Sequence, residues 1–318
     1  KIKLIFKIFL VIYVGLMNAD DFNNQEIALN HFMQGEFLMN QGNYALAILE
    51  FQDAIELDPN AATIHISIAD GYRRLGKVKR AENHLEIALD LDPEEQEALE
   101  MQGQLFLAQK RYVDAKLVYK HLYEIDSNNI DFIFTLADLA RMEKEWNTAI
   151  DYYIQGYEIN SMAISGLEKA LQIALTISDF KRAEEVCALL LIENPNNMDL
   201  LETMKDLTLF NGNYEKSLKI LNELEKLNGV SNETLIQKSA LYEELNQPDL
   251  ALKMINTALK KDSVNIEILH RLVTLLMSQE KNEEAILYNQ KIIDHHPDDP
   301  RGFINTAVMA MSGKNPED

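Results

Sequence analysis

Histidine and cysteine are the side chains of this sequence that could hold a metal ion or act as a nucleophile, and they are few. Cys187 is the single cysteine, so the chain can form no internal disulfide. His31 and His65 lie 34 residues apart, and His295 and His296 are adjacent. No cysteine or carboxylate cluster accompanies either pair at the spacing of metal ligands, so we expect packing and turn roles and no metal site. The apolar pattern around Cys187 predicts a packed core thiol.

No catalytic motif occurs in the 318 residues. The sequence lacks the Gly-x-Ser-x-Gly, His-Glu-x-x-His and glycine-rich phosphate-loop patterns. We therefore expect no enzymatic activity in this chain and no cofactor. The formal charge is −21, from 51 acidic and 30 basic residues. A chain this anionic repels phosphate backbones, which argues against nucleic acid as a partner.

Residues 1–19 have the layout of an export signal. Lys1, Lys3 and Lys7 lead into an uncharged apolar run from Ile8 to Met17, which is shorter than the roughly 20 residues that span a bilayer. We expect a cleaved signal peptide and hence a periplasmic or secreted protein. The alternative is an uncleaved N-terminal anchor, which is the only membrane attachment we expect. The mass of the mature N-terminus distinguishes them, because a chain that starts near Asp20 excludes the anchor.

A 34-residue period runs through the rest of the chain. Counted from Ala28, eight units follow one another without insertion, after a short linker over residues 20–27. The units are 28–61, 62–95, 96–129, 130–163, 164–197, 198–231, 232–265 and 266–299, with a truncated ninth over 300–318. Position 20 of the units carries Ala47, Ala81, Ala115, Ala149, Ala183, Ser217, Ala251 and Ala285.

The spacing within each unit predicts two helices. Positions 4, 7, 8 and 11 share one face of a first helix, and positions 20, 24 and 27 share one face of a second. Small residues at positions 8 and 20 let the two helices approach closely. Leu171 and Lys205 stand at position 8 where a small residue is expected, so we expect irregular helix packing near residues 165–215.

This pattern resembles the tetratricopeptide repeat family, whose unit of 34 residues has a small residue at position 8 and alanine at position 20. The resemblance covers residues 28–299 and implies an all-α fold, an α-solenoid of antiparallel helix pairs. It also implies that the first helices line a groove through positions such as 2, 5 and 9, and that this groove binds a protein or peptide.

Acidic residues are concentrated at those three positions. They fill 12 of the 24 sites in the eight units, and no lysine or arginine occupies any of them. The predicted binding residues are Glu36, Asp70, Glu97, Glu100, Asp131, Asp138, Glu168, Asp199, Glu202, Asp206, Glu233 and Glu267. One interpretation is an anionic trough that binds a basic segment. The other is a solvated acidic face that only maintains solubility.

Two functions from different classes follow. The first is a non-catalytic scaffold that binds a partner protein, in an exported or envelope setting. The second is the targeting arm of a larger enzyme, such as a glycosyltransferase, whose catalytic domain lies beyond Asp318. The sequence ends halfway through a repeat, so we expect it to be part of a longer protein. The full open reading frame tests this expectation, and the sequence does not indicate an oligomeric state.

Overall fold

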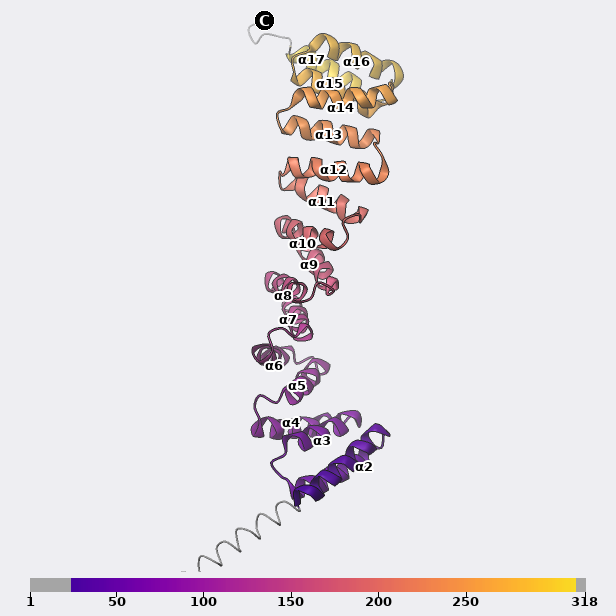
Figure 1. Cartoon of the computed structure of the whole chain (residues 1–318). Coiled ribbons are helices and arrows are strands. Elements are labelled where there is room, and N and C mark those ends of the chain that lie inside the picture. The colour runs from indigo at the N-terminus through magenta and orange to yellow at the C-terminus, as the bar shows by residue number, and fades with distance from the viewer. Residues whose placement is uncertain (1–23, 313–318) are drawn as a thin grey trace, which may run out of the picture. The chain divides into compact units, whose positions relative to one another are not determined.

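The computed structural model describes residues 24–312, and every regular element in that range is an α-helix (Figure 1). The helices group into two compact bodies, which we call the N-terminal body (described residues 24–162) and the C-terminal body (described residues 163–312). The N-terminal body contains a helix over residues 24–40 followed by α2 (Tyr44–Leu57), α3 (Ala62–Arg74), α4 (Val78–Leu91), α5 (Gln96–Ala108), α6 (Tyr112–Ile125), α7 (Ile130–Met142) and α8 (Trp146–Ile159). The C-terminal body contains α9 (Ile164–Thr176), α10 (Phe180–Glu193), α11 (Met198–Phe210), α12 (Tyr214–Asn228), α13 (Asn232–Glu244), α14 (Pro248–Lys261), α15 (Ile266–Ser278), α16 (Asn282–His295) and α17 (Pro300–Ser312).

The helix starts follow the 34-residue period. First helices begin at position 1 of a unit, as α3, α5 and α7 do, and second helices begin at position 17, as α2, α4 and α6 do. Within each body every helix packs against the next one in the chain. The predicted fold class, an α-solenoid of antiparallel helix pairs, is therefore confirmed for the described residues of both bodies.

The turn inside each helix pair has a left-handed residue at position 15. Glycine fills it in three units, as at Gly42 with φ 76°, but lysine, serine, asparagine or glutamate fills it in five, as at Lys110 with φ 62°. The N–H of Lys110 donates to Leu107 O, and the N–H of Arg111 donates to Phe106 O at 2.8 Å. This pair of bonds is the Schellman motif, which satisfies the last carbonyls of the first helix. The repeated bonds offset the strain of a left-handed side-chain-bearing residue.

Positions 8, 20 and 24 form the centre of each helix pair. All seven alanines at position 20 are fully buried, and Ser217 is 1% exposed. A β-carbon at Gly35, position 8 of the first unit, would lie 2.3 Å from Cε1 of Phe51 at position 24. Because that approach is far inside van der Waals contact, glycine is required unless the Phe51 ring moves.

Cys187 is fully buried on α10, as the sequence predicted. Its thiol donates to the carbonyl of Leu200 at 3.4 Å. Burial raises the pKa of Cys187 to about 11, so at neutral pH it is a protonated thiol and a poor nucleophile. The side chain therefore serves packing.

Part of the expected domain division is corrected. Residues 24–27, which we assigned to a short linker, are helical and continue into the first unit. No glycine or proline lies in residues 20–27, so nothing in the sequence stops the helix there. The predicted signal peptide over 1–19 and the last residues, 313–318, lie outside the described residues.

His65, which is buried, and His84, which is half-buried, form a contact between α3 and α4. Their Nδ1 atoms lie 3.0 Å apart, and the ring of Tyr72 stacks on His84 with centroids 5.7 Å apart. At this distance one Nδ1 donates and the other accepts, which requires the accepting ring to be neutral. Burial lowers the pKa of His65, and burial together with the His65 charge lowers the pKa of His84.

This pair predicts a loss of stability in mild acid. Below the ordinary histidine pKa of about 6.5, these two histidines bind protons in the unfolded chain but stay neutral in the folded protein. The free energy of unfolding therefore falls as the pH decreases towards the folded pKa values. The urea concentration at the midpoint of unfolding is expected to be lower at pH 5.5 than at pH 7.5. The double substitution His65→Leu, His84→Leu should reduce this drop, since Leu99 occupies the equivalent of His65 in the next unit. An unchanged drop in the variant would show that the pair is not its source.

Candidate functional site

Three of the predicted acidic residues line one cavity in the N-terminal body. The cavity has a volume of about 480 Å³, and we call it the acidic pocket. Glu36 comes from the helix over residues 24–40, Asp70 from α3 and Glu97 from α5. Tyr44 and Arg74 are among the other residues that line it. Successive first helices thus bring together carboxylates that are far apart in the sequence.

The carboxylates of the acidic pocket differ in how they are compensated. Glu36 accepts a hydrogen bond from Ser67 Oγ at 2.8 Å. Asp70 accepts from Arg74 Nε at 2.8 Å and also pairs with Arg73. Among the described residues Glu97 has no cationic partner. Burial, followed by the charges of neighbouring carboxylates that include Glu36 and Asp70, raises the pKa of Glu97. Glu97 therefore lies in a negative field.

Arg74 partly neutralises the negative charge on one side of the acidic pocket. Its guanidinium lies 5.6 Å from the centroid of the Tyr44 ring, in addition to its ion pair with Asp70. Hydrogen bonds to Asp70 and Tyr44 raise the pKa of Arg74, so it stays charged. The pocket therefore has a neutralised edge at Asp70 and an uncompensated edge at Glu97.

The other predicted acids of the N-terminal body lie near two buried tyrosines. Burial raises the pKa of Tyr119, and the charges of Glu100 and Asp131 raise it further. Asp138 accepts a hydrogen bond from Tyr153 Oη at 2.6 Å and pairs with Arg141 at 3.3 Å. Asp138 therefore has a structural role, whereas Asp131 is exposed and Glu100 is half-buried.

The predicted acids of the C-terminal body are partly neutralised by cations outside the 24 counted sites of the eight units. Glu202 pairs with Lys205, which also lies 3.3 Å from Asp206. Glu267 pairs with Arg301 at 2.9 Å. The remaining acids, Glu168, Asp199 and Glu233, are exposed. The acidic character of this body is therefore weaker than the sequence count implied.

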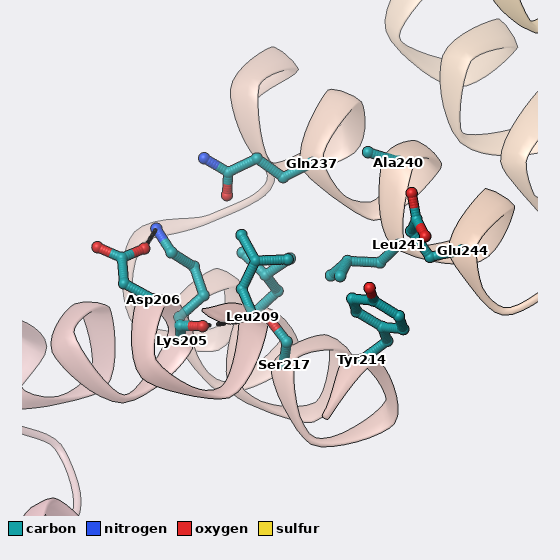
Figure 2. A pocket seen from close by; sticks show the side chains of 10 residues that line it. Lys205, Asp206, Leu209, Tyr214, Ser217, Gln237, Ala240, Leu241 and Glu244 are labelled. Atoms are coloured by element: carbon teal, nitrogen blue, oxygen red, sulfur yellow. Dashed lines mark hydrogen bonds and ion pairs between the residues drawn. The ribbon is translucent and has the colours of Figure 1, made fainter. Parts of the chain in front are cut away.

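A second cavity, which we call the apolar pocket, lies among α11, α12 and α13. Its volume is about 300 Å³. Figure 2 shows Leu209, Tyr214 and Leu241 around it, with Asp206 and Glu244 on opposite sides. One sign of this pocket is present in the sequence, because Lys205 and Ser217 depart from the usual small residue and alanine at positions 8 and 20. The helices α11 and α12 still begin at positions 1 and 17, and α12 ends one residue later than the other second helices. The expected irregular packing near residues 165–215 stays a prediction.

The two pockets occupy equivalent places in the repeat but differ in chemistry. Both have a tyrosine at position 17, Tyr44 and Tyr214. At position 9 of the following unit the acidic pocket has Asp70, whereas the apolar pocket has Ala240. The same place between neighbouring helix pairs therefore offers a carboxylate in one body and apolar walls in the other.

No helix in the described range 24–312 is long and apolar enough to cross a membrane.

Comparison with known proteins identifies the class. Models described as tetratricopeptide repeat match residues 28–61 and 66–130. The TPR repeat-containing protein YpiA of Bacillus subtilis is 24% identical over 290 residues, which is 89% of this chain and 66% of that protein. With the 34-residue helix pairs, these matches make the chain a tetratricopeptide repeat protein.

More distant relatives agree with the fold. The DnaJ homolog subfamily C member 3 of Bos taurus is 23% identical over 233 residues, 73% of this chain and 42% of its own length. The solved structure of Naa15/Naa10 bound to HypK-THB aligns with a TM-score of 0.57 at 16% identity, over 79% of this chain and 39% of that chain. The chain thus spans less than two thirds of the length of each of these relatives.

Proposed function

We propose that this chain is a non-catalytic scaffold that binds a basic segment of a partner protein or peptide through the acidic residues of its first helices. Tetratricopeptide arrays present extended surfaces for protein–protein interaction. The observation that carries the proposal is the acidic pocket, where Glu36, Asp70 and Glu97 from three helices line one cavity. Burial and then repulsion by neighbouring carboxylates raise the pKa of Glu97, and a basic side chain there would offset both.

The binding proposed here is electrostatic and therefore depends on salt. Exposed charges separated by more than about 8 Å are screened at physiological ionic strength, so a lysine-rich segment gains most from close contact with several carboxylates. The apolar pocket supplies the C-terminal body with a separate place for an apolar side chain, with Asp206 and Glu244 beside it for a neighbouring basic group.

Fluorescence anisotropy with two labelled peptides tests the proposal. A lysine-rich peptide is expected to bind, with an affinity that falls steeply between about 50 and 300 mM NaCl. A glutamate-rich peptide of the same length is expected not to bind. Equal affinities for the two peptides, or no binding of the lysine-rich peptide at low salt, would contradict the proposal.

The setting we propose is an exported one, supported by the signal-like sequence of residues 1–19. The alternative proposal is that these repeats recruit substrates for a larger enzyme, such as a glycosyltransferase. Two relatives that are longer than this chain favour the alternative, because the chain covers 66% of the length of YpiA and 42% of the length of the DnaJ homolog. A full-length reading frame without a catalytic domain would exclude the alternative, and a mature chain that keeps residues 1–19 would exclude export by cleavage.

A further inference from the structure

Three potential metal ligands meet in the first helix pair. His31 lies on the helix over residues 24–40, and Glu50 and Asp53 lie one turn apart on α2. One ligand atom from each lies within 4.8 Å of the other two. His31 Nδ1 and Glu50 Oε2 are 2.8 Å apart. One nitrogen and two carboxylate oxygens thus converge on a volume the size of a coordinated ion.

The repeat explains how these residues come together. His31 stands at position 4 and Glu50 at position 23, and in the next unit the same positions hold His65 and His84, whose Nδ1 atoms are 3.0 Å apart. Positions 4 and 23 therefore face each other closely in both units. Residues three apart on a helix share a face, so Asp53 at position 26 joins Glu50.

The third donor and solvent access distinguish the two units. Position 26 of the second unit is Ile87, so that site has two nitrogen donors and no carboxylate from this position, and its His65 is only 6% exposed. In the first unit the side chains of His31 and Glu50 are 35% and 31% exposed. An ion and its water ligands can therefore reach the first-unit site.

We propose that His31, Glu50 and Asp53 bind a divalent transition metal ion, for which Zn²⁺ is the appropriate probe. One imidazole and two carboxylates suit Zn²⁺, with water in a fourth position. An imidazole donor disfavours Mg²⁺ and Ca²⁺, which prefer oxygen ligands only. Bound metal cross-links the helix over residues 24–40 to α2.

Isothermal titration calorimetry of the full chain without an affinity tag tests this site. The parent protein is expected to bind one equivalent of Zn²⁺ and not Mg²⁺. His31→Gln and Asp53→Asn are each expected to weaken Zn²⁺ binding about tenfold or more. The matched control is His295→Gln, His296→Gln, which removes the two adjacent turn histidines at the C-terminal end of α16 and should leave the affinity unchanged.

Three results would overturn the proposed metal site. The parent protein could fail to bind Zn²⁺, or both ligand variants could retain the parent affinity, or the turn-histidine control alone could lose it. Circular dichroism checks that the variants fold, and Asp53 is exposed, so Asp53→Asn leaves the packing intact. Hydrogen exchange of the helix over residues 24–40 adds a structural readout. Zn²⁺ should slow it in the parent and not in Asp53→Asn, whereas a simple ion pair between His31 and Glu50 would give no such response.

Discussion

Neutralising the acidic pocket is expected to weaken binding of a lysine-rich peptide by about ten- to a hundredfold. The variant is Glu36→Gln, Asp70→Asn, Glu97→Gln, which keeps the size of each side chain and removes three negative charges. Close charge pairs at exposed or half-buried sites contribute about 0.5–1 kcal/mol each, and three of them give a loss of that order. Fluorescence anisotropy at low salt measures the change.

A matched control separates the pocket from the net charge of the chain. Glu86→Gln, Asp90→Asn, Glu124→Gln removes the same number of charges from exposed positions on the second helices α4 and α6. This control is expected to change the affinity less than about twofold, because distant exposed charges are screened. Equal losses in the two triple variants would show that general electrostatic attraction, and not the acidic pocket, holds the peptide.

Truncating Phe51 is expected to have the largest effect on stability. Phe51 is fully buried at position 24, contacts the ring of Phe32 with centroids 5.7 Å apart, and fills the space beside Gly35. Phe51→Ala removes this packing and leaves a cavity, which costs about 3–5 kcal/mol of the free energy of unfolding. Urea denaturation followed by circular dichroism measures the loss.

The control for Phe51 is Phe37, which is 57% exposed on the preceding helix. Phe37→Ala deletes the same atoms and is expected to cost less than about 1 kcal/mol, since surface substitutions away from special features are nearly neutral. Because helix pairs in such arrays contact mainly their neighbours, the Phe51 effect should appear in the N-terminal body first. Equal losses for the two variants would contradict the assigned packing.

The sequence predicted the helix pairs because their centres repeat without gaps. Ala81 and Leu85 lie one turn apart on one face, and the structure buries both completely. The period also fixed where the first helices begin, as at Ala62 for α3. The left-handed residue at position 15 was not predicted. Only three of the eight residues there are glycine, and side chains such as Lys110 carry no signal for that conformation.

The acids at positions 2, 5 and 9 predicted where carboxylates lie but not which of them are paired with cations. Arg73 and Arg74 lie three and four residues after Asp70 on the same helix face and pair with it. Neither stands at position 2, 5 or 9. Lys205 likewise neutralises Glu202 from position 8. The contact between positions 4 and 23 depends on how the two helices pack, so the sequence pattern alone does not place His31 beside Glu50. The number of acids at positions 2, 5 and 9 therefore overstates the negative charge of these helices in the C-terminal body.

Zero-length crosslinking of a lysine-rich peptide tests directly whether the acidic residues of the first helices contact a basic partner. A carbodiimide joins a lysine amine only to a carboxylate in contact with it, and mass spectrometry then identifies the residue. We expect crosslinks at Glu36, Glu97, Glu100 and Asp131 of the first helices. Crosslinks confined to Glu86, Asp90 and Glu124 of the second helices would contradict it.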